Sequence, residues 1–313
     1  MIRLLFVFVL SISCVFADES EMTGQQWLEK MSHAMETYNY HGTVAFFKSG
    51  RLDTMKYFHA TNEGLQQERL LSLNSPMREV IREGGKVSCV FKKSNKVVVN
   101  HRPVSGSFIV DLPTDFSASN SVYQFSLKGE ESVAMLPSRV ISIEAKDPYR
   151  YSRKIWIDKQ FFLPLKIEVY DLSGARLEQV VFTDLQVVEN LAIVRADSNI
   201  EITNIKHIHQ EESSAVEMAG FVLENVPAGF QTIFFTRMNR SNSEQAVDHL
   251  LLSDGFSSIS VYRELKEENI QLGLQTLGTV NSFTHVIDDF EITVMGEVPA
   301  ETVQFIAQGI KFR

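Results

Sequence analysis

The sequence predicts an α+β protein in which a large, curled antiparallel sheet is followed by a smaller domain of strands and one helix. Between residues 41 and 187, short runs of alternating apolar and polar residues are separated by turn residues, a series typical of consecutive hairpins. One amphipathic helix precedes this series, and a shorter group of strand-like runs follows a polar stretch. A chain of 313 residues is long enough to form two such domains.

Residues 1–17 have the pattern of a secretory signal peptide. Residues 4–16 are almost wholly apolar and follow Arg3, and Val15 and Ala17 are small residues of the kind that signal peptidase reads. The apolar stretch is too short to span a bilayer. Cys14 offers a lipoprotein alternative, but no leucine opens a lipobox before it. We therefore expect an exported chain.

Cleavage would leave Cys89 as the single cysteine of the mature chain, which excludes an intramolecular disulfide. Cys89 lies in a strand-like apolar run, and no histidine or cationic residue that would activate its thiol can be identified from the sequence. We expect it to act as a small buried hydrophobe.

The first element of the mature chain is an amphipathic helix predicted over residues 25–40. Its apolar residues recur at spacings of three and four, and Thr23 is available as the N-cap. The stripe consists of Trp27, Leu28, Met31, Ala34, Met35 and Tyr38. This helix has one face to bury, and the curled sheet that follows can cover it.

The large domain is expected over residues 18–195, and residues 156–182 form its clearest hairpin. In this stretch Leu165, Ile167 and Val169 are expected to share one face of a strand. Asp158 and Asp171 lie beside turns, where a carboxylate caps backbone N–H groups more often than it performs acid-base chemistry.

A polar stretch over residues 196–217 predicts a linker with a short strand near residues 200–205. The second domain then spans residues 218–313. It contains strand-like runs near residues 231–238, 249–264 and 290–295 and ends in a helix that begins at Pro299.

The sequence offers little support for catalysis or for nucleic-acid binding. It lacks the nucleophile elbow, the zinc-protease motif and the glycine-rich nucleotide loops, and its net charge of −9 argues against a nucleic-acid partner. His207 and His209, with Glu211 and Glu212, form the best metal candidate and would suit a metal hydrolase, but solvated side chains in a linker are the favoured interpretation. We expect no enzyme activity, no metal and no cofactor.

Apolar surface is the more informative feature. A curled sheet rich in phenylalanine can either fill its own core or enclose acyl chains, and composition alone leaves both open. The residues expected to line such a lipid cavity are Phe91, Phe108, Leu165, Ile167, Val169 and Val181.

Two basic clusters on this acidic chain are either solvated charges or ligands for the phosphate groups of an anionic lipid. The candidates for lipid phosphate are Lys92, Lys93, Arg150, Arg153 and Lys154.

Six stretches, in this order along the chain, resemble the RseB/MucB family of sigma-E regulatory proteins. They are "MREVIREGGKVSCV" (77–90), "FIVDLP" (108–113), "DPYRYSRKIWIDKQFFLPLKIEVYDLSGARLEQVVF" (147–182), "VPAGF" (226–230), "LLLSDGFSSISVY" (250–262) and "EITVMGEVPAETVQFIAQGIKF" (291–312). The resemblance implies an N-terminal domain similar to LolA and LolB, an unclosed antiparallel β-barrel with helices in its opening. It also implies a smaller C-terminal α/β domain.

The resemblance also implies a function. Family members reside in the periplasm of Gram-negative bacteria and bind the periplasmic part of an inner-membrane anti-sigma factor, RseA or MucA. They protect it from the site-1 protease and release it when lipopolysaccharide or a related lipid binds. A periplasmic lipid or lipoprotein carrier is the alternative, and homo-oligomerisation stays open. By motif, the partner-binding candidates in the C-terminal domain are Pro227, Phe230, Ser253, Asp254 and Phe256.

Overall fold

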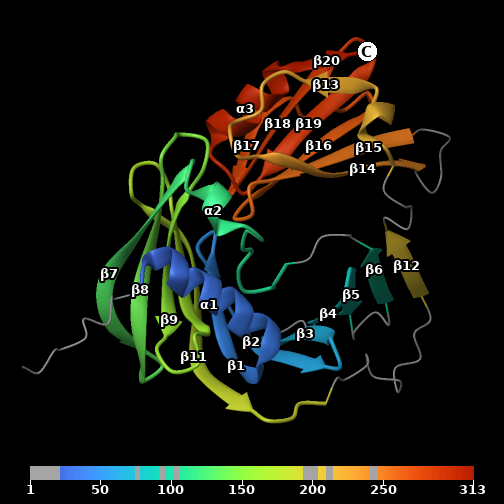
Figure 1. Cartoon of the computed structure of the whole chain (residues 1–313). Helices are drawn as coiled ribbons and strands as arrows, with labels where there is room; N and C mark the ends of the chain where they lie inside the picture. The colour runs from blue at the N-terminus through green and yellow to red at the C-terminus, as the bar shows by residue number, and fades with distance from the viewer. Residues whose placement is uncertain are drawn as a thin grey trace, which may run out of the picture.

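The computed structural model describes residues 22–74, 78–91, 96–101, 106–192, 204–208, 214–239 and 246–313. The chain forms two domains, with the C-terminal domain stacked on one end of the larger N-terminal domain (Figure 1). Within the described residues, no helix combines the length and the apolarity needed to cross a bilayer. The predicted signal peptide lies outside these residues.

A twelve-stranded sheet forms the wall of the N-terminal domain, and its order is β12-β6-β5-β4-β3-β2-β1-β11-β10-β9-β8-β7. Neighbouring strands are antiparallel except for β12, which runs parallel to β6. The strands are β1 Asn39–Lys48, β2 Arg51–Asn62, β3 Leu65–Ser72, β4 Arg78–Glu83, β5 Lys86–Phe91, β6 Lys96–His101, β7 Tyr123–Val133, β8 Leu136–Ala145, β9 Ser152–Asp158, β10 Pro164–Tyr170, β11 Arg176–Val188 and β12 Asn204–Ile208. In the described part of the chain, edge strands β7 and β12 do not pair with each other, so the predicted unclosed antiparallel barrel is confirmed.

Helix α1, Gly24–Thr37, lies across the opening of this sheet and buries the predicted stripe except for Tyr38, which follows the helix and is exposed. Thr23 is the N-cap, and its side chain and that of Gln26 each accept a hydrogen bond from the other residue's backbone N–H group, which forms a capping box. The helix ends at Thr37, three residues before the predicted end, because Tyr38 takes an extended conformation.

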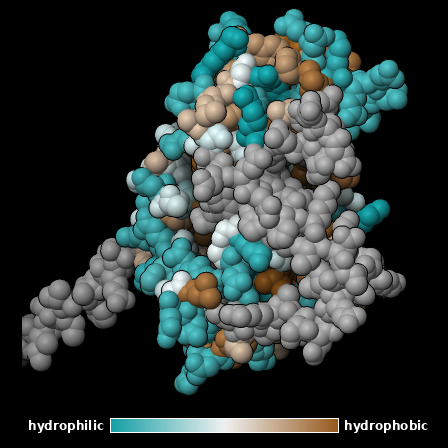
Figure 2. Space-filling view, turned by 90° about the vertical axis from the view of Figure 1, so that its right-hand side faces the viewer, coloured by the Kyte–Doolittle hydropathy of each residue, from teal (hydrophilic) through white to brown (hydrophobic). Residues whose placement is uncertain are grey.

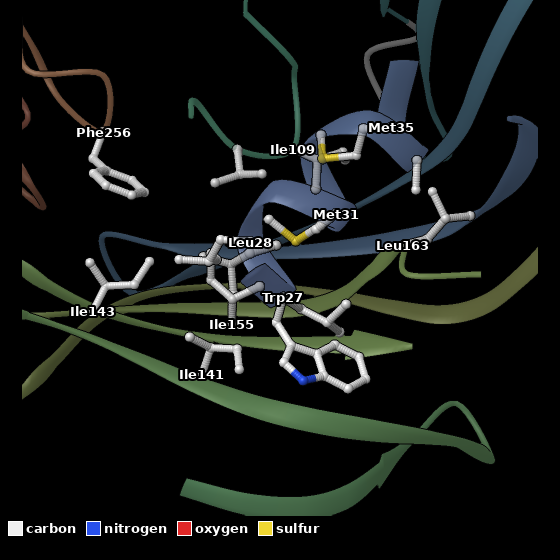
Figure 3. Packing of buried hydrophobic residues seen from close by; sticks show 14 of the residues in the cluster. Trp27, Leu28, Met31, Met35, Ile109, Ile141, Ile143, Ile155, Leu163 and Phe256 are labelled. Carbon is white, nitrogen blue, oxygen red and sulfur yellow. The ribbon is translucent and has the colours of Figure 1, made fainter. Parts of the chain in front are cut away.

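The core of the N-terminal domain lies between α1 and the inner face of the sheet (Figure 3). Trp27, Leu28 and Met31 of the helix pack against Ile141 and isoleucines of the neighbouring strand β9. Each fully buried side chain of this size stabilises the domain by roughly 1.5–3 kcal/mol. Phe256 enters the same cluster although it belongs to the C-terminal domain.

The C-terminal domain is a six-stranded antiparallel sheet covered on one face by a helix. The sheet order is β14-β15-β16-β19-β18-β17, and a separate two-stranded ladder joins β13 to β20. The elements are η1 Val216–Met218, β13 Phe221–Leu223, β14 Gln231–Asn239, β15 Ala246–Ser253, β16 Ser258–Leu265, β17 Gly273–Leu277, β18 Val280–Ile287, β19 Phe290–Gly296, α3 Ala300–Gln308 and β20 Ile310–Phe312. Helix α3 begins after Pro299, as predicted, and buries Val303 and Ile306.

The turns at both ends of β10 confirm the predicted capping roles. Asp158 Oδ2 accepts hydrogen bonds from the backbone N–H groups of Gln160 (3.0 Å) and Phe161 (2.6 Å). Asp171 Oδ1 does the same for Ser173 (2.9 Å) and Ala175 (2.8 Å). These carboxylates hold turns together, as their positions in the sequence indicated.

The face predicted for Leu165 is wrong. The pairing of β9 with β10 shifts between Pro164 and Lys166, so a β-bulge interrupts the alternation on which the prediction relied. Ile167 joins the main core, whereas Leu165 packs with Trp156 in a separate cluster. Lys166 lies over the Trp156 ring, 3.8 Å from its centroid, on the same outer face.

Candidate functional site

The residues singled out in the two domains meet at a buried junction between them. Arg150 lies between β8 and β9, and Asp254 lies in the turn between β15 and β16. The Arg150 Nη1 atom is 2.9 Å from Asp254 Oδ2, and both side chains are fully buried. Arg150 is the largest fully buried side chain among the described residues.

Each nitrogen atom of the Arg150 guanidinium group donates a hydrogen bond. Its Nε donates to Asp147 Oδ1 (3.0 Å), and its Nη2 donates to the carbonyl oxygen of Ala228 (2.5 Å). The rings of Tyr123 and Phe230 lie 5.3 and 5.0 Å from the guanidinium carbon. Such pairing is what allows a charge to be buried at all.

Asp254 accepts four hydrogen bonds, two within its own turn and two across the junction. Its Oδ1 accepts from the backbone N–H groups of Phe256 (3.0 Å) and Ser257 (2.8 Å). Its Oδ2 accepts from Arg150 and from the hydroxyl of Tyr123 (2.8 Å). Burial raises the pKa of Tyr123, so this hydroxyl stays protonated and keeps its role as donor.

The same turn inserts an aromatic ring into the N-terminal core. Phe256 lies 5.0 Å from the Tyr123 ring and 6.2 Å from the Phe116 ring, centroid to centroid. Arg153 Nη2 donates to the Phe256 carbonyl (2.8 Å) and to Ser257 Oγ (2.9 Å). We call the group formed by Arg150, Arg153, Asp254 and Phe256 the inner contact.

Arg150 and Arg153 were expected to bind lipid phosphate at a cavity rim; the structure instead buries Arg150 in the domain junction, whereas Arg153 borders a hollow of about 370 Å³. Both are buried and are engaged by the C-terminal domain in this structure. Lys154 is half-buried, lies 5.1 Å from the Tyr170 ring and borders the same hollow. Lys92 and Lys93 lie outside the described residues, so their predicted role stays a prediction.

The partner-binding candidates lie in or beside the inner contact. Pro227 and Phe230 are buried in the loop whose Ala228 carbonyl receives Arg150. Ser253 Oγ accepts from the Gly255 N–H (3.0 Å) and donates to the Ser257 carbonyl (2.9 Å), which shapes the turn. In this conformation Phe230, Asp254 and Phe256 contact the N-terminal domain of the same chain.

A second group of residues joins the two domains beside the turn between β17 and β18, at the same end of the C-terminal sheet. Lys48 Nζ lies 2.7 Å from carboxylate oxygens of both Glu178 and Glu297, and Thr279 also bonds Glu178. Burial alone would lower the pKa of Lys48, but the two carboxylates outweigh burial and raise it. We call Lys48, Glu178, Thr279 and Glu297 the outer contact.

Helix α3 adds a third link near the inner contact. Its Thr302 hydroxyl donates to the carbonyl of Tyr149 (2.8 Å), and the Phe305 ring stacks on the Tyr149 ring at 4.9 Å. α3 is thus held against the loop that carries Arg150.

A pocket of about 680 Å³ opens between α1 and the segment of residues 106–116, and we call it the α1 pocket. Its helical wall is polar and includes Glu29, Ser32, His33 and Glu36, and its strand wall includes His59, Glu68 and Arg82. Its apolar wall includes Met35, Val110, Leu112, Pro113 and Phe116.

Glu68 anchors the start of the 106–116 segment. Its carboxylate accepts from the Tyr57 hydroxyl (2.6 Å), from the Phe108 N–H (3.1 Å to Oε2) and from Ser107, and it lies 3.5 Å from Arg82 Nε. At the other end, Asp115 caps the short helix α2, Phe116–Ser119. Both ends of the segment are therefore fixed, and side-chain packing holds its middle.

The residues predicted to line a lipid cavity do not line the α1 pocket, and they do not lie together. Phe108 and Ile167 belong to or pack on the main core, whereas Leu165 and Val181 lie in the cluster around Trp156 on the other face of the sheet. Phe91 and Val169 are half-buried in β5 and β10. Sequence alternation pointed to strands, but the pocket is made by a helix and an irregular segment, whose contacts have no sequence period.

No group of three or more histidine, cysteine, aspartate or glutamate residues that could hold a metal is found among the described residues. His209, Glu211 and Glu212 lie outside them. On the face shown in Figure 2, the described surface is mostly hydrophilic, with hydrophobic residues in small separate patches.

Comparison with known proteins extends over both domains. The family described as the MucB/RseB N-terminal domain matches residues 23–208, and the MucB/RseB C-terminal domain matches residues 215–311. The sigma-E factor regulatory protein RseB of Salmonella typhimurium is 28% identical, over 91% of this chain and 90% of the relative. The sigma factor AlgU regulatory protein MucB of Pseudomonas aeruginosa is 26% identical, over 91% and 90%.

Solved structures agree with this fold. MucB in complex with MucA(peri) superposes with a TM-score of 0.70 at 23% identity, covering 93% of this chain and 99% of that one. The MucA/MucB complex of Pseudomonas aeruginosa gives a TM-score of 0.72 at 24% identity, with the same coverage. Because both of its domains match the family, the chain belongs to the MucB/RseB family.

Proposed function

We propose that the protein is a periplasmic negative regulator of an envelope-stress sigma factor. It binds the periplasmic part of a transmembrane anti-sigma factor of the RseA/MucA type, shields it from site-1 proteolysis and releases it when lipopolysaccharide or a related lipid binds. The observation that carries the proposal is the match of both domains, in order, to a family whose relatives are named as sigma factor regulators.

The architecture supports regulation by linkage. A ligand that prefers the conformation unable to hold the anti-sigma factor must weaken that complex, and the anti-sigma factor must weaken ligand binding equally. The two domains are joined through a limited set of contacts. Both ligands can therefore shift the equilibrium between two arrangements of these domains.

The test is a column that carries the periplasmic segment of the anti-sigma factor encoded in the same genome. We expect the column to retain the purified mature chain and lipopolysaccharide to elute it. Retention that lipopolysaccharide leaves unchanged would contradict the lipid-controlled part of the proposal, and absence of retention would contradict the whole.

A periplasmic lipid or lipoprotein carrier is the second candidate, and the α1 pocket is the observation in its favour. A carrier would transfer bound lipid to acceptor vesicles without any anti-sigma segment present. The carrier proposal gives no role to the C-terminal domain, whose residues Asp254 and Phe256 complete the core of the first domain.

A further inference from the structure

Phe256 belongs to the C-terminal domain, but its side chain lies in the core of the N-terminal domain. It is only 4% exposed, and three of its aromatic neighbours, Phe116, Tyr123 and Phe125, belong to the other domain. Figure 3 shows its ring entering the cluster from the C-terminal domain, toward the helix that carries Met31. A ring held there by another domain can leave when that domain moves.

The 106–116 segment separates this ring from the α1 pocket. Phe116 lines the pocket and also contacts Phe256. Pro113 lines the pocket too, and it packs so closely on Gly255 that a Cβ atom added there would lie 2.4 Å from Pro113 Cβ. The two residues thus have the pocket on one side and the docked turn on the other.

The distribution of polarity in the pocket indicates where a hydrocarbon chain would go. The helical wall carries Glu29 and Glu36, which would repel an anionic headgroup and offer no apolar contact. Apart from Met35 of α1, the apolar lining residues named above lie on the 106–116 wall, and more apolar surface lies behind this wall, where Phe256 now sits. A chain gains free energy in proportion to the apolar area it covers, so a long chain is drawn toward that inner end.

We propose that Phe256 occupies the inner end of an acyl-chain site that begins in the α1 pocket, so that a long hydrocarbon chain and the docked Ser253–Ser257 turn compete for it. The inference rests on the proposed function, because it names the residue through which a lipid would act on the C-terminal domain. A chain too short to reach Phe116 occupies the pocket without disturbing the turn.

The outer contact offers a way to strengthen docking without touching the pocket. The turn around Gly278 and the turn around Phe256 lie at the same end of the C-terminal sheet, as the pairing of β15 to β19 shows. A Cβ atom on Gly278 would lie 3.5 Å from Ser49 Cβ, a distance suited to a disulfide. Both positions have positive φ, 52° and 64°, so the backbone is not a regular strand at either.

The experiment uses the mature chain with Cys89→Ser, Ser49→Cys and Gly278→Cys, oxidised or reduced. The disulfide raises the effective concentration of the docked turn and therefore favours it over a competing chain. Calorimetric titration with monomeric dodecyl maltoside should give an affinity about 5- to 150-fold lower for the oxidised than for the reduced form. Octyl maltoside, the short-chain control, should bind both forms alike.

Gly255→Ala should act in the opposite direction to the disulfide and weaken docking of the turn. The added methyl group would collide with Pro113 without opening a cavity. We expect this variant to bind dodecyl maltoside more tightly than the wild-type chain. Equal dodecyl maltoside affinity in the oxidised and reduced forms would overturn the inference, and so would unchanged or weaker binding by Gly255→Ala. Retention on the anti-sigma column, measured on the same preparations, tests the proposed function separately.

Discussion

The inner and outer contacts join the same two domains but differ in almost every physical respect. At the inner contact, the side chains of Arg150 and Asp254 are fully buried and bind each other and further residues through hydrogen bonds and ion pairs. At the outer contact, the side chains of Lys48 and Glu297 are 43% and 50% exposed. Burial makes the loss of one partner costly, whereas exposure lets water and salt replace it. The difference indicates that the inner contact contributes more than the outer contact to holding the two domains together.

The largest effect is expected from Arg150→Ala. This change leaves Asp254 buried with a net charge and without its main partner, which typically costs about 3–5 kcal/mol. Urea unfolding should show the loss as a lower midpoint with a similar slope. Lys154→Ala is the matched control, since Lys154 is only half-buried, and it should lose less than about 1 kcal/mol. Equal losses would mean that burial does not distinguish the two.

Phe256→Ala should come next. It removes a ring from the N-terminal core and leaves a cavity, for which about 3 kcal/mol is typical. Because the ring comes from the C-terminal domain, the variant should also make the loop around Pro113 easier to cleave by limited proteolysis. Phe47→Ala, at a position 36% exposed, is the control and should leave both measurements near wild type. A Phe256 variant as stable as that control would show that the ring does not hold the domains.

A smaller effect, below about 1 kcal/mol, is expected for Lys48→Ala, because its two ion pairs are partly exposed. Salt screens such pairs, so the difference between wild type and variant should shrink as sodium chloride is added. Unfolding midpoints at low and high salt provide the measurement. A loss that stays constant with salt would argue that the outer contact is as well shielded as the inner one.

The smallest effect concerns pH and the wall of the α1 pocket. Burial lowers the pKa of His59 below its ordinary value of 6.5, and its Nδ1 atom lies 2.8 Å from the Tyr38 carbonyl. Between the lowered value and 6.5 the unfolded chain binds more protons at this residue than the folded one, so stability falls on acidification through that window. His59→Asn should remove this part of the pH dependence. Identical pH profiles of the unfolding midpoint in wild type and variant would contradict the assignment.

Much of the fold follows from local sequence patterns. Helix α1 has its cap and its stripe within about a dozen residues, and the turns at Asp158 and Asp171 are formed by side chains that bond backbone two to four residues away. Such signals need no knowledge of the rest of the chain. The β-bulge at Leu165 has no such signal, and a one-residue shift was enough to place this side chain on the opposite face.

The individual residues of the inner contact could be predicted from the sequence, but their pairing could not, because they are far apart in the chain. Arg150 and Asp254 are separated by 104 residues, and each alone resembles a surface charge beside a turn. The basic cluster selected Arg150 as a ligand for lipid phosphate, whereas the family resemblance selected Asp254 as a contact for a protein partner. Nothing in the spacing indicated that they bind each other, since only the tertiary fold brings the two loops together.

A double-mutant cycle on Arg150 and Asp254 tests most directly whether they form one interdomain site. Free energies of unfolding would be measured for the wild-type mature chain, for Arg150→Ala, for Asp254→Ala and for the double variant. Partners in one buried pair should be strongly coupled, so the double variant should lose at least about 1 kcal/mol less than the two single losses together. Losses that add within about 0.5 kcal/mol would show that the two residues act independently and would contradict the account.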